Sequence, residues 1–239
     1  MTWTLGRLGS RFNLLLEPCQ RRVMHSALGR FLDAPLDLMV GLVEPDGIER
    51  VLPLSTRGTP LLNCEQFARV NSITFRGFSE NYGLRFEFNL HSVFYPQNED
   101  LCTLPAFYLE MRVNPCSRVR WCVPKGSTPE NVKLFIRLQR PDTRISASID
   151  NDGLQGRIDL AYANRLEPVG DAVGSTPRRE PRNSSMVNVL ERIVSLTPGA
   201  VPDADGQGLT IDLPVTEEGS GIKWRLVWGA YVNDRFWNN

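Results

Sequence analysis

Apolar and polar residues alternate strictly along much of this chain. In residues 84–91 every even position is apolar and every odd position is polar, and residues 107–113 show the same alternation. The pattern continues, with turn-forming dipeptides and tripeptides between the segments, in residues 119–123, 132–138 and 145–149. Because successive side chains of a strand point to opposite faces, this pattern predicts antiparallel strands with one face buried and the other in water.

Further segments extend the β pattern. Residues 36–43 and 48–54 flank Glu44-Pro45-Asp46-Gly47, which predicts a hairpin. Alternation returns in residues 209–213 and 222–228, whereas residues 187–196 fit either a strand or a short helix. A sheet with one apolar face must bury it, and a second sheet is the usual partner. We therefore predict a mainly β fold, an antiparallel two-sheet β-sandwich.

The N-terminal segment shows a different spacing. Four apolar residues after Pro18 can share one face of a helix, namely Val23, Leu28, Phe31 and Leu32. Pro18 itself suits the first turn of a helix. This spacing predicts a short N-terminal helix.

These patterns divide the chain into two parts. We expect an N-terminal helical segment at residues 1–35 and a β-sandwich domain at residues 36–239. Gly, Pro, Ser and Arg dominate from about residue 167 to 186, which predicts a long exposed loop inside that domain.

The composition narrows the class of protein. The chain has 239 residues, of which 41% are hydrophobic, so it can bury a sizeable core. Lys and Arg total 27, equal to the total of Asp and Glu, which argues against a nucleic-acid-coating protein. The chain has no run of about 18 apolar residues, so the sequence predicts no membrane span. The five cysteines have no metal-site or redox spacing, and the N-terminus lacks a secretory-signal pattern. These features predict free thiols and a cytoplasmic location.

Motifs that carry catalysis are missing from the sequence. The chain contains no G-x-S-x-G elbow, phosphate loop, dinucleotide fingerprint or H-E-x-x-H pair, and its two histidines are His25 and His91. Since no complete catalytic constellation is evident, we assign no catalytic, cofactor-binding or metal-binding residue. The sequence favours a non-catalytic role, and leaves open whether the protein is an enzyme.

Polar positions on the predicted strands, together with aromatic residues, are candidates for binding a ligand. Aromatic rings offer surfaces on which a sugar can stack, while polar side chains hydrogen-bond its hydroxyls. The candidate ligand-binding residues are Tyr108, Glu110, Arg112, His91, Tyr231 and Trp237. They predict a carbohydrate ligand, with a protein partner or a second copy of the chain as the alternative.

A basic stretch lies between Cys116 and Arg144, and we expect its cations to lie on one sheet face. With an aromatic residue such as Phe135, such a face could hold RNA or single-stranded DNA. A solvated face shielded by acids on adjacent strands is the favoured interpretation, because the charge of the whole chain is balanced. Nucleic acid is therefore not the expected partner.

Two segments resemble a known family. Residues 98–119 contain Leu104-Pro105, an alternating strand and then Asn114-Pro115, and residues 223–229 form an aromatic-rich closing strand. These features are similar to the N-terminal β-sandwich of glycoside hydrolases that carry an (α/α)6 catalytic barrel, such as the non-lysosomal glucosylceramidase family. The resemblance extends over residues 68–140 and 209–232. Those enzymes have their catalytic carboxylates in the downstream barrel, which this chain is expected to lack, so no catalytic residue is carried over.

Three functions follow as hypotheses. The first is a non-catalytic β-sandwich module of carbohydrate-enzyme type that binds carbohydrate or a partner protein. The alternative is a structural or scaffold protein that self-assembles through its sheet edges and its aromatic C-terminal tail. The third is a small hydrolase that uses His91 and a carboxylate.

Overall fold

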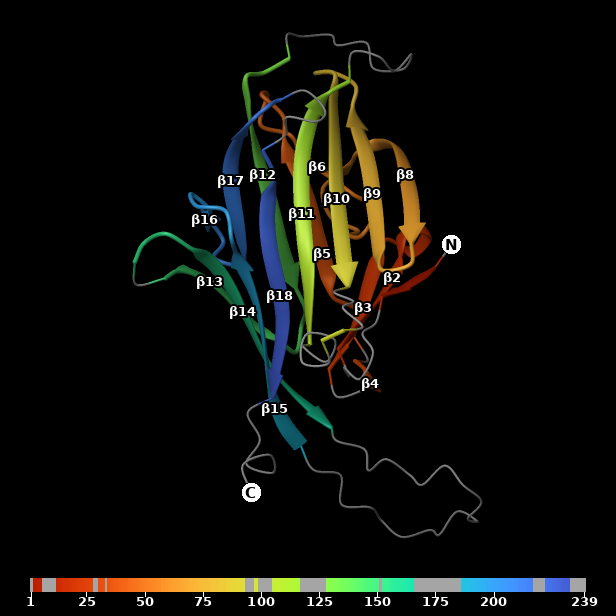
Figure 1. Cartoon of the computed structure of the whole chain (residues 1–239), viewed down its shortest axis with the longest axis vertical. Coiled ribbons are helices and arrows are strands. Elements are labelled where there is room, and N and C mark those ends of the chain that lie inside the picture. Colours follow the sequence, from red (N-terminus) through yellow and green to blue (C-terminus); the bar gives the residue numbers. More distant parts are fainter. Residues whose placement is uncertain are drawn as a thin grey trace.

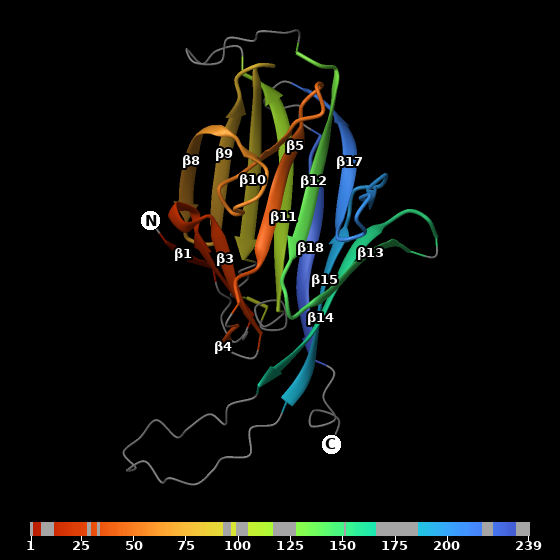
Figure 2. The same cartoon turned by 180° about the vertical axis from the view of Figure 1, so that it is seen from behind.

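The structure is a computed structural model that describes most of the chain. The described residues are 2–5, 12–27, 30–32, 34–92, 97–98, 105–116, 128–150, 152–165, 186–216 and 222–232. They form three β-sheets of eight, six and four strands, and the two larger sheets pack face to face (Figures 1 and 2). The prediction of a mainly β chain with packed sheets is confirmed. The pairing is antiparallel except for one parallel pair in the six-stranded sheet, and the four-stranded sheet is an addition to the two sheets that were predicted.

The largest sheet has eight strands, and every neighbouring pair in it is antiparallel. In spatial order its strands are β13 (Arg144–Ile149), β14 (Gly156–Arg165), β15 (Met186–Ser195), β18 (Trp224–Val232), β11 (Ala106–Pro115), β10 (Leu84–Ser92), β9 (Ser72–Ser79) and β8 (Leu62–Arg69). The segment at residues 187–196, which fitted either a strand or a helix, therefore lies mainly in a strand.

The six-stranded sheet covers one face of the eight-stranded sheet. In spatial order it contains β16 (Val201–Pro202), β17 (Gly208–Pro214), β12 (Asn131–Gln139), β5 (Asp37–Val43), β6 (Glu49–Val51) and β7 (Thr59–Pro60). The predicted hairpin is confirmed, since β5 pairs with β6 in antiparallel register. Its turn depends on Gly47, which has a φ of 85° that side chains disfavour.

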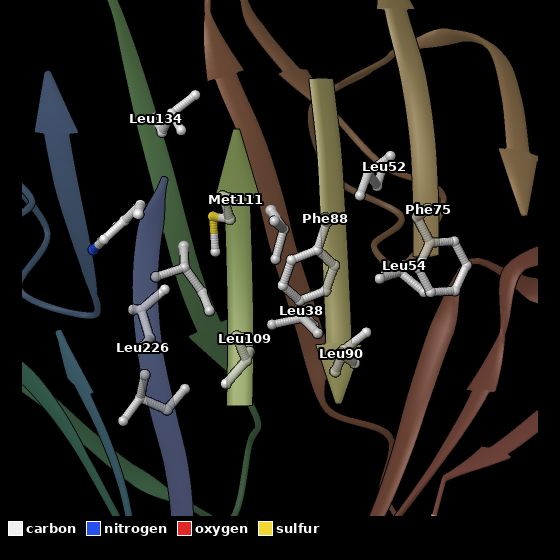
Figure 3. Close-up of a cluster of buried hydrophobic side chains, with 14 of the residues drawn as sticks. Leu38, Leu52, Leu54, Phe75, Phe88, Leu90, Leu109, Met111, Leu134 and Leu226 are labelled. Atoms are coloured by element: carbon white, nitrogen blue, oxygen red, sulfur yellow. The ribbon is translucent and has the colours of Figure 1, made fainter. Parts of the chain in front are cut away.

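The hydrophobic core lies between these two sheets. Figure 3 shows Leu38 of β5 and Leu134 of β12 among side chains from the eight-stranded sheet, such as Phe88, Met111 and Leu226. All five side chains are fully buried. Burial of each such side chain stabilises the fold by about 1.5–3 kcal/mol. The alternating apolar positions of the sequence are thus the residues that face inward.

The predicted N-terminal helix is wrong. The N-terminal segment forms a four-stranded sheet of β1 (Trp3–Leu5), β2 (Asn13–Glu17), β3 (Arg22–Ala27) and β4 (Arg30–Phe31), with a short 3-10 turn, η1 (Pro18–Gln20), between β2 and β3. Arg21 follows this turn with a φ of 50°, which reverses the chain. Val23 and His25 then point inward two residues apart, the spacing of a strand. Leu28 lies outside the described residues.

The N-terminal sheet shares its core with the rest of the fold. Leu14, Leu16 and Val23 are fully buried and belong to the same hydrophobic cluster as the residues between the two larger sheets. Val23 also forms an antiparallel bridge with Leu36, just before β5.

Two predicted segments lie outside the described residues, namely the strand at residues 119–123 and residues 166–185 of the loop. Nowhere in the described ranges is there a helix with the length and apolar character needed to cross a membrane.

Candidate functional site

The outer face of the eight-stranded sheet is the side turned away from the six-stranded sheet (Figure 1). This face carries polar side chains in two neighbouring rows. Strand register sets these rows, because residues directly opposite on adjacent strands share a face. One row contains Phe67, Thr74, Asn89, Glu110 and Arg225. The next row contains Arg69, Ser72, His91, Tyr108 and Val227. Side chains that are distant in sequence therefore meet on one surface.

These rows surround a hollow of about 560 Å³ on the outer face. Strands β8 to β11 and Lys223, just before β18, line this outer-face hollow. The structure thereby brings together His91, Glu110 and Arg112, three of the candidate ligand-binding residues. Tyr108, a fourth candidate, is the cross-strand neighbour of His91 on the same face.

Two aromatic rings stand at opposite sides of this region. Tyr108 on β11 is 43% exposed and Phe67 on β8 is 44% exposed. The two strands are three places apart in the sheet, which corresponds to about 14 Å at ordinary strand spacing. The guanidinium of Arg76 lies 4.9 Å from the centre of the Phe67 ring and holds that ring against the sheet.

The floor of the hollow is a buried carboxylate held by arginines. Glu87 is only 1% exposed, and it accepts hydrogen bonds from Nε of Arg76 at 2.8 Å and from Nε of Arg112 at 2.6 Å. Nε of Arg85 lies 3.4 Å from the same carboxylate. One carboxylate thus orients three guanidinium groups, which fixes Arg112 in place as part of the hollow.

His91 and Glu110 form the polar centre of the hollow. Burial lowers the pKa of His91, as do the nearby charges of Lys223 and Arg69, against an opposing effect of Glu110. Burial raises the pKa of Glu110, but the hydrogen bond and charge of Lys223, together with the charges of His91 and Arg225, outweigh this effect and lower the pKa. Nζ of Lys223 donates that bond at 2.8 Å.

This electrostatic arrangement does not suit Glu110 to the role of a general acid. A general acid that works near neutral pH needs a carboxyl pKa that is raised, whereas the pKa of Glu110 is lowered. Across the part of the chain that the structure describes, no three His, Cys, Asp or Glu side chains gather as metal ligands would. The amide, hydroxyl and charged side chains that line the hollow suit hydrogen bonding and charge recognition.

The other two candidates do not join this group in the described residues. Only the backbone of Tyr231 is described, in β18 opposite Leu190, and Trp237 lies outside the described residues. Sequence reasoning missed several residues of the hollow. Asn89 lies two residues before His91, on the same polar face of β10, so the alternation could have revealed it. Phe67 and Arg69 lie on the edge strand β8, where alternation is weak.

The expectation that the basic stretch forms one sheet face is wrong. Lys133 and Arg137 belong to β12 of the six-stranded sheet, and Arg144 belongs to β13 of the eight-stranded sheet. The guanidinium of Arg137 donates two hydrogen bonds, of 2.7 and 2.8 Å, to the carboxylate of Glu49, which lies on another strand. Phe135 is fully buried, so its ring is not available to stack on a base.

No protein-family model matches this chain, and no curated protein shows detectable sequence similarity to it.

Proposed function

We propose that this chain is a non-catalytic β-sandwich module that binds carbohydrate on the outer face of its eight-stranded sheet. The observation that carries the proposal is the pair of half-exposed rings, Tyr108 and Phe67, on either side of a polar hollow. A sugar ring presents apolar C–H faces that stack on aromatic rings and hydroxyls that need hydrogen-bond partners. The separation of their strands, about 14 Å, suits a short oligosaccharide better than a single sugar.

The groups between the rings have the required chemistry. Asn89 offers the NH2 of its amide, whose oxygen already accepts a hydrogen bond from the Thr74 hydroxyl. Ser72 offers a hydroxyl and Glu110 offers a carboxylate. They project from three paired strands, so the sheet holds them in place before the ligand arrives. A preformed, mostly polar surface of this kind supports binding. It also agrees with the resemblance of residues 68–140 and 209–232 to a sandwich that accompanies glycoside hydrolases.

Calorimetric titration of the full chain with a panel of neutral and acidic oligosaccharides tests the proposal. Tyr108→Ala and Phe67→Ala should each weaken binding by about tenfold or more, since a loss of 1.4 kcal/mol is a factor of ten. Leu154→Ala is the matched control, because Leu154 is 61% exposed in the connection between β13 and β14. The proposal would be contradicted if no oligosaccharide of the panel bound. It would also be contradicted if both ring variants bound as tightly as the unchanged chain.

Self-assembly through sheet edges and the C-terminal tail stays a prediction. Residues 233–239 lie outside the described residues. Light scattering of the full chain and of a variant that lacks these residues would test this alternative. Self-assembly through the tail requires the variant to have a lower oligomeric mass than the full chain. The expected cytoplasmic location likewise stays a prediction.

A further inference from the structure

The outer-face hollow holds more positive than negative charge, although the whole chain is neutral. In the hollow and the ion pairs that border it, the described cations are Arg69, Arg76, Arg85, Arg112, Lys223 and Arg225. The described carboxylates that oppose them are Glu65, Glu87 and Glu110. This imbalance makes the surface locally electropositive, and such a surface attracts an anionic ligand.

Most of these cations are already engaged. Arg76 and Arg112 share Glu87, while Lys223 and Arg225 share Glu110. Arg69 differs, because it is exposed and makes no ion pair with any residue in the described ranges. It lies in the same row as His91, separated from it only by Ser72.

We infer that the carbohydrate bound here is an acidic one, with a sugar carboxylate between Arg69 and His91. This inference rests on the proposed function and specifies its ligand class. The guanidinium of Arg69 can pair with a carboxylate through two parallel hydrogen bonds, and the imidazole of His91 can donate a third. The neighbouring hydroxyls and the Asn89 amide then hold the neutral part of the sugar, and the rings of Tyr108 and Phe67 hold its apolar faces.

The test compares acidic oligosaccharides with their own neutral forms. Oligomers of galacturonan, mannuronan and hyaluronan are titrated calorimetrically into the full chain, each beside its carboxyl-reduced counterpart. At least one acidic oligomer should bind about tenfold tighter than its reduced form, and its affinity should fall as salt rises. Arg69→Gln should abolish this difference, whereas Lys133→Gln, which removes an exposed cation from the six-stranded sheet, should preserve it.

The other possible results each contradict either the inference alone or the inference together with the proposed function. Equal affinity for acidic and reduced forms, or binding to neutral oligosaccharides alone, would overturn the inference and leave the proposed function intact. Absence of binding to all acidic and neutral oligosaccharides would overturn both. Equal loss of affinity in Arg69→Gln and Lys133→Gln would place the binding elsewhere. Displacement of the acidic oligomer by an equal charge concentration of polyphosphate would show that charge alone is recognised, which also overturns the inference.

Discussion

His25 on β3 and Glu191 on β15 face each other inside the protein, with 3.1 Å between Nε2 and Oε1 and neither side chain exposed. The hydroxyl of Tyr162 donates a hydrogen bond to the same carboxylate oxygen, and Nε1 of Trp228 donates to the other oxygen at 2.9 Å. The contact joins the N-terminal sheet to the eight-stranded sheet. A buried charge destabilises a fold unless partners compensate it. The stability of this contact therefore depends on all three partners of the Glu191 carboxylate.

Glu191→Gln should destabilise the fold by about 3 kcal/mol, the cost of breaking a buried charged contact. A glutamine side chain has one acceptor oxygen, so its amide would turn a donor toward either Tyr162 or Trp228. Tyr162→Phe removes a single hydroxyl donor and should cost about 1 kcal/mol. Urea unfolding measures both values. A Glu191→Gln protein with the free energy of unfolding of the unchanged chain would contradict this role.

The same contact predicts sensitivity to acid. Burial raises the pKa of Glu191, but His25, Tyr162 and Trp228 together lower it below the ordinary value of 4.5. The unfolded chain therefore takes up this proton more readily than the folded chain. The stabilisation is complete above the unfolded pKa and is lost as the pH falls through the lower, folded pKa.

Urea unfolding between pH 7 and pH 3 tests this dependence. The unchanged protein should lose more stability on acidification than Glu191→Gln, in which position 191 no longer titrates. Other carboxylates such as Glu110 titrate in both proteins, so the difference between the two curves isolates Glu191. Parallel curves would rule out a lowered pKa at this position.

The imidazole of His91 should titrate below its usual value of 6.5, because burial and the charges of Lys223 and Arg69 disfavour its protonated form. Lys223→Gln should raise the pKa of His91, and Glu110→Gln should lower it, since Glu110 acts in the opposite direction. The chain has only two histidines, so proton NMR can follow each one. Shifts of the same sign in both variants would contradict the described geometry of the hollow.

Gly41 on β5 should not tolerate a side chain. A Cβ at this position would lie 1.7 Å from the carbonyl oxygen of Arg50 on the paired strand β6. Gly41→Ala should therefore cost about 3 kcal/mol, or lower the melting temperature by about 6 °C or more. Gly229→Ala is the control, because its Cβ would meet nothing closer than Pro105 O at 3.6 Å. Equal melting temperatures for the two variants would contradict the close strand approach.

Local pattern predicted the strands because a strand buries every second residue. Leu84 to Leu90 and Phe107 to Val113 alternate between apolar and polar residues without exception, although Glu87 on the polar face is also buried, and both segments are central strands of the large sheet. The Glu44 to Gly47 turn was predictable because its Asp-Gly pair suits a tight reversal.

The N-terminal segment shows where local pattern fails. Four apolar residues fitted helical spacing, yet Val23 pairs across strands with Leu16, and Leu36 bridges to it from beyond the segment. Pairing with distant strands outweighs the weak preference of so short a stretch for a helix. The helical prediction could not weigh those contacts, since they come from other parts of the chain.

In the central strands, the sequence by itself determined which residues lie on the apolar face and which lie on the polar face, because side-chain alternation is a local property of a strand. It therefore indicated that His91, Glu110 and Arg112 lie on polar faces. Only the tertiary structure decided that these residues meet Arg69 and Lys223 in one hollow. The physical reason is that strand order and register depend on how distant strands pair and share a core, and no local period encodes that choice.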